Sequence, residues 1–291
     1  MTTIDQPPLN EDQWLLRHAR NVHSIAGEDG IIGKIFETVP PENRWCVEFG
    51  AWDGKTYSNT HHLMQDGWSG VFVEADPARF KDLVKTYEHT SSAHCVNCFV
   101  TFEGENSLDS LLARTPIPKN FDLLSIDIDG NDYHVWQSLV QYRPRVVIIE
   151  FNNTIPSHVE FIQPRDMGVH QGSSPLSLVK LGREKGYELV CVTEHNVIFV
   201  LAPLLAAFHI ADNALSRLRL PSPVEFHLFQ LYDGTFVVGG PTVMPWHGLP
   251  VRPEQFQVLP KMFRVFPSES LGVFKKVLRR VWRFFYLNRA G

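Results

Sequence analysis

Trp45-Cys-Val-Glu-Phe-Gly-Ala-Trp-Asp-Gly54 is the stretch that decides the fold of this chain. Its apolar beginning is typical of a buried strand, and the glycines that follow predict a tight turn into the next element. Glycine also lets the backbone approach a ligand without a Cβ in the way. The stretch therefore predicts a strand that ends in a ligand-binding turn, with Glu48, Gly50 and Gly54 as candidate binding residues.

A second apolar run, 71–73, ends at Glu74. An acid at the tip of a second strand, about 20 residues downstream, holds the ribose hydroxyls of nucleoside cofactors in open α/β folds. The spacing of Glu48, Gly50 and Gly54 differs from the glycine pattern that cradles a pyrophosphate. S-adenosylmethionine has no phosphate, and its ammonium group tolerates a nearby acid. The pattern favours S-adenosylmethionine over a dinucleotide, with a ligand-free βα turn as the alternative.

Apolar runs alternate with amphipathic segments along most of the chain, which predicts a largely parallel sheet covered on both faces. Only residues 194–196 separate the last two strands, and no crossover helix fits there, so these strands must be antiparallel. This is the arrangement of a class I methyltransferase: an α/β, Rossmann-like, doubly wound sheet with an antiparallel last strand. The predicted strands are 45–50, 70–75, 93–100, 121–128, 145–151, 187–193 and 197–201, and the predicted helices are 11–23, 31–38, 56–65, 77–87, 107–112, 132–142 and 176–185.

Changes in the pattern divide the chain into four predicted segments. A helical cap over 1–40 precedes the cofactor-binding domain, 41–203. An irregular extension packed on the core, 204–267, precedes a basic amphipathic helix, 268–291. Within the extension we expect a helix over 204–218 and a hairpin over 226–238 that turns at Asp233-Gly234.

Composition narrows the class of protein. The 291 residues carry a formal net charge of −5, which argues against general nucleic-acid binding. Four scattered cysteines fit a reducing compartment. Cys95-x-x-Cys98 lacks a second ligand pair, so core thiols are favoured over a zinc site. The sequence shows neither a signal peptide nor an apolar run long enough to span a bilayer, and we expect a cytoplasmic protein.

These motifs together resemble the FkbM-type methyltransferases. The resemblance runs from about Glu28 to Leu201 and rests on residues 28–32, 47–54, 58–60, 73–76, 124–133, 149–152 and 185–187. It implies an S-adenosylmethionine-dependent enzyme that methylates oxygen on sugars, glycolipids or natural products. It also implies that Glu48, Gly50 and Glu74 hold the cofactor, with Asn97 or its neighbours near the adenine.

Acidic side chains gather where two neighbouring strands end. Asp127 and Asp129 share one face of their strand, and Glu150 and Asn152 share a face at the end of the next. Ligands bind at these carboxyl ends in open α/β sheets. We therefore assign Asp127 to the cofactor as well as to the cluster. Close carboxylates need a neutralising cation or a raised pKa, and oxygen ligands suit Mg²⁺ or Mn²⁺.

Methyl transfer to a hydroxyl needs positioning and removal of a proton. Asp129, Asp132 and His134 are the candidate proton acceptors by their location after the fourth strand. A simpler interpretation of this loop is an Asp-Gly turn followed by a helix N-cap at Asn131 or Asp132.

Residues 271–287 form a different kind of segment. Apolar residues recur at helical spacing, five basic residues occupy the rest of the helical wheel, and no acid follows Glu269. This pattern is typical of a helix that lies on an anionic membrane surface, here the inner face of the membrane. A helix packed on its own domain or on a partner subunit is the alternative. The oligomeric state stays open, with a homodimer as one alternative.

The favoured function is O-methylation of a hydroxyl on a sugar, glycolipid or related small molecule, assisted by a divalent metal. A non-catalytic cofactor-binding or membrane-docking scaffold is the second hypothesis. An NAD-type oxidoreductase is disfavoured by the glycine spacing and by the terminal hairpin.

Overall fold

The computed structural model describes residues 8–288. The chain divides into two compact units, Met1–Ser222 and Pro223–Gly291, which we describe separately. The unit boundary falls after Ser222, and the four segment boundaries expected from the sequence stay predictions.

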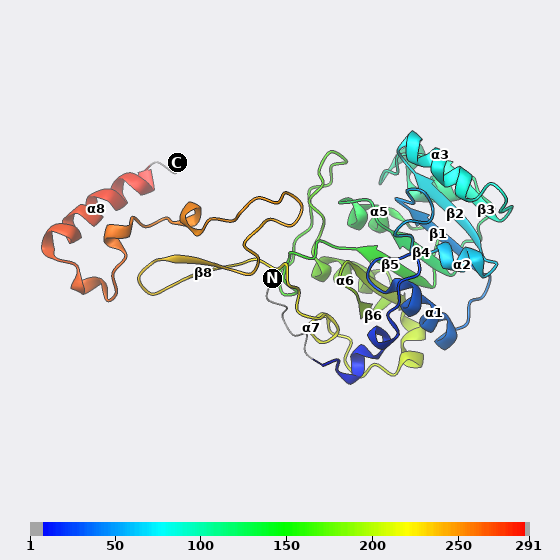
Figure 1. The fold of residues 1–291 in the computed structure, drawn as a ribbon, viewed down its shortest axis with the longest axis horizontal. Helices are drawn as coiled ribbons and strands as arrows, with labels where there is room; N and C mark the ends of the chain where they lie inside the picture. The colour runs from blue at the N-terminus through cyan, green and yellow to red at the C-terminus, as the bar shows by residue number, and fades with distance from the viewer. Residues whose placement is uncertain (1–7, 289–291) are drawn as a thin grey trace. The chain divides into compact units, whose positions relative to one another are not determined.

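A seven-stranded sheet in the order β3-β2-β1-β4-β5-β7-β6 forms the centre of the first unit (Figure 1). Strands β1 to β5 pair in parallel, whereas β7 is antiparallel to both β5 and β6, between which it lies. This topology confirms the predicted Rossmann-like, class I methyltransferase fold. The strands are β1 (Trp45–Phe49), β2 (Ser69–Glu74), β3 (Ala93–Asn97), β4 (Leu123–Ile126), β5 (Val146–Glu150), β6 (Tyr187–Val192) and β7 (Asn196–Leu201).

Helices cover both faces of this sheet. One face packs against α4 (Leu108–Leu112), α5 (Asp132–Ser138), α6 (Pro175–Glu184) and α7 (Leu215–Leu218). The other packs against the 3₁₀ helices η1 (Glu11–His18) and η3 (Ala202–Phe208) and against α1 (Glu28–Thr38), α2 (His61–Gln65) and α3 (Pro77–Thr86). A further 3₁₀ turn, η2 (Gly104–Asn106), precedes α4. The strands read as continuous apolar runs because successive side chains enter opposite cores.

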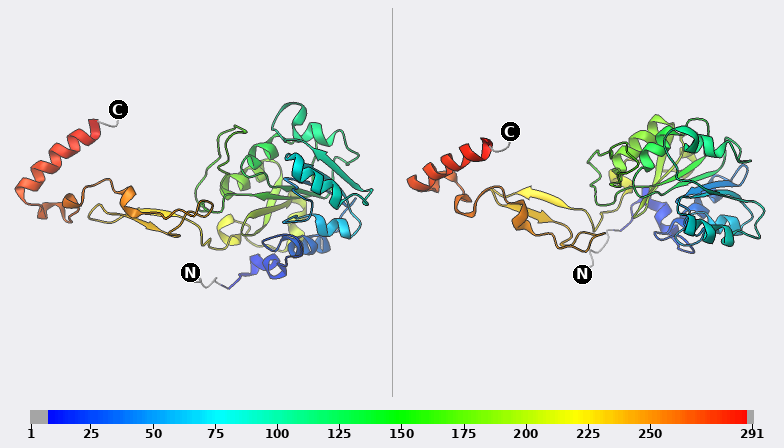
Figure 2. Two further views of the ribbon diagram at one scale, coloured as in Figure 1. Left: turned by 45° about the horizontal axis from the view of Figure 1, so that its top comes forward. Right: turned by 90° about the horizontal axis from the view of Figure 1, so that it is seen from above.

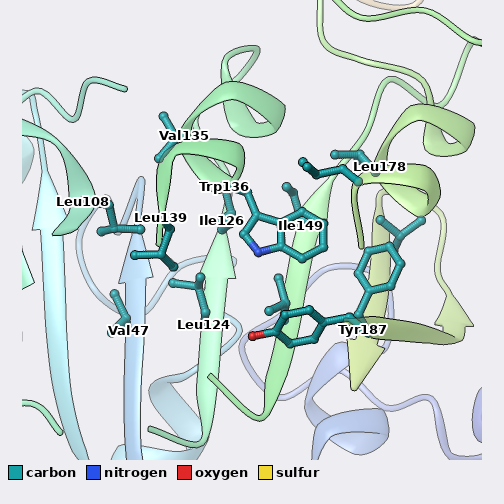
Figure 3. Close-up of a cluster of buried hydrophobic side chains, with 14 of the residues drawn as sticks. Val47, Leu108, Leu124, Ile126, Val135, Trp136, Leu139, Ile149, Leu178 and Tyr187 are labelled. Carbon is teal, nitrogen blue, oxygen red and sulfur yellow. The ribbon is translucent and has the colours of Figure 1, made fainter. Parts of the chain in front are cut away.

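Trp136 is the largest fully buried side chain among the described residues, and it belongs to the core under α5 and α6. Its ring centroid lies 5.2 Å from that of Phe199 and 5.7 Å from that of Tyr187. Figure 3 shows Trp136 and Leu139 facing the strand residues of this core. This aromatic cluster fixes the position of α5, which begins directly after the acidic loop.

The helix expected over 56–65 is wrong in its first half, because α2 begins only at His61. Glu48 accepts hydrogen bonds from the Ser58 hydroxyl, the Asn59 amide and the Thr60 hydroxyl, at 2.6 to 2.8 Å. These bonds hold residues 58–60 in a loop, since a helical conformation would turn the same groups away from Glu48.

Two other expected helices are also broken. Residues 11–18 form a 3₁₀ helix, and 204–218 splits into η3 and α7. Asp12 explains the second break, because its carboxylate accepts the amides of Ala211 and Asp212 at 2.8 and 3.3 Å. His209, with φ of 52°, turns the chain out of the helix just before these amides.

The second unit contains the predicted hairpin, formed by β8 (His227–Gln230) and β9 (Phe236–Gly239). Short 3₁₀ turns η4 (Pro253–Phe256), η5 (Lys261–Phe263) and η6 (Ser268–Ser270) lead to α8 (Val273–Asn288), the red helix in Figure 2. Among residues 8–288, no helix combines the length and the apolar character that crossing a membrane requires.

Candidate functional site

The glycine turn after β1 brings two strand ends into close contact. Gly50 has φ of 73°, and a Cβ on it would lie 1.7 Å from the backbone oxygen of Asp127. Gly54 has φ of 74°, and its Cβ would lie 2.6 Å from a Leu83 methyl group. Only glycine fits both the backbone conformation and the space. The candidate cofactor turn and the start of the acidic loop therefore lie against each other at the carboxyl ends of β1 and β4.

Glu48 is buried, and its carboxylate points at the 58–60 loop. Burial raises the pKa of this carboxyl, although the hydrogen bonds from Ser58 and Thr60 oppose the shift. The contacts show a positioning role for Glu48 in the loop beside the glycine turn, a role that the spacing alone did not indicate. Its direct contact with a cofactor stays a prediction.

Glu74 lies at the tip of β2, as the sequence indicated. One carboxylate oxygen accepts the Trp52 amide at 2.8 Å, and the other accepts the Asp76 amide at 2.7 Å. The Asn97 side chain donates to the Glu74 backbone oxygen at 2.7 Å, so these two predicted cofactor residues are neighbours. Each carboxylate oxygen offers two acceptor sites, which leaves capacity for the two hydroxyls of a ribose.

Trp52 is a residue of this turn that the sequence interpretation missed. It adopts φ of 48°, and the Arg79 guanidinium lies 4.5 Å from the centre of its ring. The indole is 39% exposed, so the stacked pair forms part of the surface beside Glu74. A left-handed conformation at a tryptophan has no signature in the residue pattern, because tryptophan rarely adopts it.

The structure brings three of the predicted acids together. One carboxylate oxygen from each of Asp127, Asp129 and Glu150 lies within 4.8 Å of the others. Asp127 and Asp129 are exposed and Glu150 is half-buried. Asp129 has φ of 55°, a left-handed conformation that aspartate tolerates better than most residues. The cluster therefore faces solvent at the ends of β4 and β5.

Burial is the main cause that raises the pKa of Glu150, followed by the charge of Asp127. Asp127 is exposed as a residue, but the protein around its carboxyl group removes water from it, and this desolvation raises the pKa of Asp127 to about 7, with the charges of Asp132 and Asp129 adding to the effect. The two side chains share a hydrogen bond, so one proton held between them relieves their repulsion. Solvent at the exposed part of Asp127 screens part of this interaction.

The other predicted residues of this loop make structural contacts. Asp132 is buried, and its carboxylate accepts the amides of Ile128 and Gly130, both at 2.9 Å. His134 is buried in α5 and donates from Nε2 to the backbone oxygen of Gln163 at 2.9 Å. Asp132 thus shapes the loop that carries Asp129, and His134 anchors the segment after β5. Their catalytic assignments stay predictions.

Asn152 follows β5 and is engaged by its own loop. Its amide oxygen accepts the Thr154 hydroxyl at 2.6 Å, and its amide nitrogen donates to Gln171 at 2.8 Å. These bonds tie the Asn152 side chain to the irregular segment between β5 and α6, which borders the acidic loop. Its role as a metal ligand stays a prediction.

Gln163 organises the segment between β5 and α6. This side chain is 1% exposed, and its amide oxygen accepts the amides of Gln171 and Gly172, both at 2.9 Å. Its amide nitrogen donates to Val169 at 2.9 Å. Asn131, at the start of α5, donates to the same Val169 oxygen at 3.1 Å, so this segment borders the acidic loop. A lone glutamine in an irregular segment carries no sequence signal for such a role.

Comparison with solved structures finds methyltransferases. The O-methyltransferase from Bacillus cereus in complex with SAH is 16% identical, with a TM-score of 0.42 over 67% of this chain and 92% of that one. Monomeric WbdD is 14% identical, with a TM-score of 0.41 over 63% of this chain and 42% of that one. A SAM-dependent methyltransferase from Aquifex aeolicus is 10% identical, with a TM-score of 0.35 over 58% of this chain and 86% of that one.

A search of curated proteins gives no match. The family model of the methyltransferase FkbM domain matches residues 104–189, the part of the first unit that runs from η2 through the acidic loop to β6. The match confirms the resemblance read from the sequence. Residues 104–189 are therefore similar to the methyltransferase FkbM domain, and they lie in a sheet with the class I, Rossmann-like topology.

Proposed function

We propose that this protein transfers the methyl group of S-adenosylmethionine to a hydroxyl of a sugar, glycolipid or related small molecule. The close approach of Gly50 to the Asp127 backbone carries this proposal. This contact places two groups of residues next to each other. The glycine turn and Glu74 suit the nucleoside of the methyl donor, and the acidic cluster suits a polar acceptor. A negatively charged surface beside a sulfonium favours the cation of the donor and a neutral, hydroxylated acceptor over an acidic one.

The chemistry needs a group that takes the hydroxyl proton as the oxygen attacks the methyl carbon. Asp129 is our proposed proton acceptor, because it is exposed beside Asp127 and Glu150 and its carboxylate makes no direct hydrogen bond within residues 8–288. Asp132 would hold the loop in place through its two amide contacts. His134, through Gln163, would order the segment that borders the acceptor.

A divalent cation suits this donor set. The three converging ligands, Asp127, Asp129 and Glu150, are all carboxylates, which hard cations such as Mg²⁺ or Mn²⁺ prefer, and Asn152 could add an amide oxygen. When bound, such an ion would lower the pKa of a coordinated hydroxyl. Neutralising the clustered charge would also remove the repulsion that raises the pKa of Glu150.

Chelation of divalent metals is expected to suppress methyl transfer, and added Mg²⁺ or Mn²⁺ is expected to restore it.

Asp129→Asn should lower kcat by about 10²–10⁴-fold, the usual contribution of a general base, because the amide keeps the shape of the side chain but loses the basic charge. Affinity for S-adenosylhomocysteine should change far less. Asp82→Asn, an exposed aspartate in α3, is the matched control. The assay uses labelled methyl donor with native glycan and lipid extracts as acceptors.

Full turnover by the chelated enzyme would reject the metal and leave proton transfer to the carboxylates alone. In that case the rate should rise with pH through an apparent pKa above that of free aspartate. Unchanged turnover of Asp129→Asn would reject Asp129 as the proton acceptor.

Glu74→Ala should weaken binding of S-adenosylhomocysteine by roughly 10- to 150-fold, or about 1.5–3 kcal/mol, the cost of losing hydrogen bonds to a charged group. The variant loses the predicted ribose contacts and also frees the Trp52 amide. Isothermal calorimetry measures the effect, with Glu88→Ala, at an exposed glutamate after α3, as the control. An unchanged dissociation constant would remove Glu74 from the cofactor site.

Calorimetry and the methyl-transfer assay together separate the remaining alternatives. Tight binding of NAD in place of S-adenosylhomocysteine would favour the oxidoreductase. Binding of S-adenosylhomocysteine without turnover across a broad acceptor panel would favour a scaffold. A glycolipid acceptor would place the enzyme at the inner face of a membrane, and the basic helix α8 supports that placement. A homodimer remains open to measurement by light scattering.

A further inference from the structure

Helix α8 presents an exposed surface that methyl transfer does not require. From this surface we infer that α8 docks the protein on a membrane rich in anionic lipids, with the helix lying in the plane of the interface. The inference rests on α8 alone and does not depend on the proposed chemistry.

The residues of α8 separate into two faces. At about 100° per residue, six apolar side chains and the five basic side chains occupy opposite halves of the helical wheel, while Leu287 falls on the basic half. The apolar face consists of Phe274, Val277, Leu278, Val281, Phe284 and Phe285, and the basic face consists of Lys275, Lys276, Arg279, Arg280 and Arg283. This helix contains no acidic residue, so the charge of the basic face is not neutralised within the helix.

The apolar face is open within the described part of the second unit. None of the residues of α8 is buried, and Phe274 and Phe285 are 78% and 61% exposed. Water contact with so many adjacent apolar side chains is unfavourable, and exposed patches of this kind mark interaction sites.

Trp282 has a different role from the other aromatic residues of the helix. Its ring centroid lies 6.1 Å from that of Phe263 in η5 and 5.0 Å from that of Tyr286. These contacts attach α8 to its own unit along the boundary between the two faces. The apolar face is left available to a partner.

An anionic bilayer satisfies both faces at once. Apolar side chains enter the boundary of the acyl chains while the cations meet anionic headgroups. A second copy of α8 on the apolar face would cover the phenylalanines but would leave both sets of five cations without an anionic partner. Nucleic acid would neutralise the cations but leave the phenylalanines in water. The sixteen residues with five cations are too short and too polar to cross the bilayer, which favours an interfacial orientation.

The test is sedimentation of the full-length protein with two kinds of vesicle, one of pure phosphatidylcholine and one that also contains phosphatidylglycerol. We expect roughly tenfold or stronger binding to the anionic vesicles at low salt, weakening as salt screens the headgroups. Val281→Glu and Phe285→Glu should each reduce this binding by at least about tenfold, because they place a carboxylate in the apolar face.

Val140→Glu is the matched control, since Val140 is an exposed apolar residue in the first unit and the substitution makes the same change in charge. Calorimetry with S-adenosylhomocysteine, expected to be unchanged in all three variants, shows that the first unit is folded. Docking is rejected if the full-length protein ignores anionic vesicles at low salt, or if Val281→Glu binds them as well as Val140→Glu. Concentration-dependent dimerisation lost in Val281→Glu would assign the face to a second copy instead. Loss of vesicle binding leaves the cofactor result intact, so failure of this inference and failure of the proposed function are distinguishable.

Discussion

Gly50→Ala should abolish cofactor binding and lower the melting temperature by roughly 5–15 °C. A Cβ at this position would meet the Asp127 backbone oxygen at 1.7 Å, and the residue has φ of 73°. The left-handed conformation costs about 1–2 kcal/mol for a residue other than glycine, and forced overpacking costs about 1–3 kcal/mol more. Backbone cannot give way as a flexible side chain can, so the ends of β1 and β4 must separate. Their separation would displace the glycine turn and Asp127 together.

Gly33→Ala provides the control for this experiment. Gly33 lies in α1, where an added Cβ meets no atom within 4 Å, and alanine is the better helix former. We expect Gly33→Ala to retain cofactor affinity and to gain up to about 1 kcal/mol of stability. Thermal unfolding and calorimetry with S-adenosylhomocysteine measure both variants. Wild-type affinity in Gly50→Ala would show that the two strand ends do not form one site.

The second large effect is a dependence of stability on pH that becomes weaker in Glu150→Gln. Burial raises the pKa of Glu150, and of Asp127 to about 7, in the folded protein. The unfolded chain titrates near pH 4. Because the folded state holds its protons more tightly, the stability contribution is complete below about pH 4. It is lost as the pH rises through the folded-state pKa values.

Glu150→Gln keeps the size of the side chain and removes one of the two charges that repel at high pH. The variant should therefore exceed the wild type in melting temperature at pH 8 by at least a few degrees, about 3 °C per kcal/mol for a unit of this size. At pH 4 the two proteins should differ little. Comparing the two proteins at each pH cancels the titration of the other carboxylates.

Glu184→Gln, at the exposed end of α6, is the control, and its melting temperature should follow the wild type at both pH values. Chelator is included, since a bound cation would neutralise the cluster and hide the effect. An equal melting-temperature difference at pH 4 and pH 8 would mean that the substitution acts through packing. The charge interaction between Glu150 and Asp127 would then be too weak to matter.

Much of this architecture could be predicted from periodicity and turn chemistry. The order of strands and helices follows from apolar runs and their terminators, and the antiparallel β7 follows from a connection too short for a crossover helix. Glu74 and the cluster of Asp127, Asp129 and Glu150 could be predicted from the positions of these residues at strand ends. The carboxyl ends of parallel strands meet at one edge of the sheet, whatever the details of packing.

Contacts between distant parts of the chain decided the rest. Glu48 binds residues 58–60 and shortens α2, and Asp12 captures Ala211 and Asp212 and breaks the helix expected after β7. The local pattern of apolar and polar residues indicates which side chains are buried. It does not indicate which buried polar group will form a hydrogen bond with which partner. A buried carboxylate must be hydrogen-bonded, and the donors that satisfy it override local helix propensity.

The candidate site also combines features that the sequence predicts with features that depend on tertiary contacts. The residue types and the strand ends were determined by the sequence alone, including the glycines of the turn and the convergence of the acids. The tertiary structure decided that Gly50 must be glycine because Asp127 lies against it, that Asp132 shapes the acidic loop, and that Gln163 orders the segment beside it. The physical reason is that these roles depend on distances and hydrogen-bond directions across the sheet, which exist only once the strands are aligned.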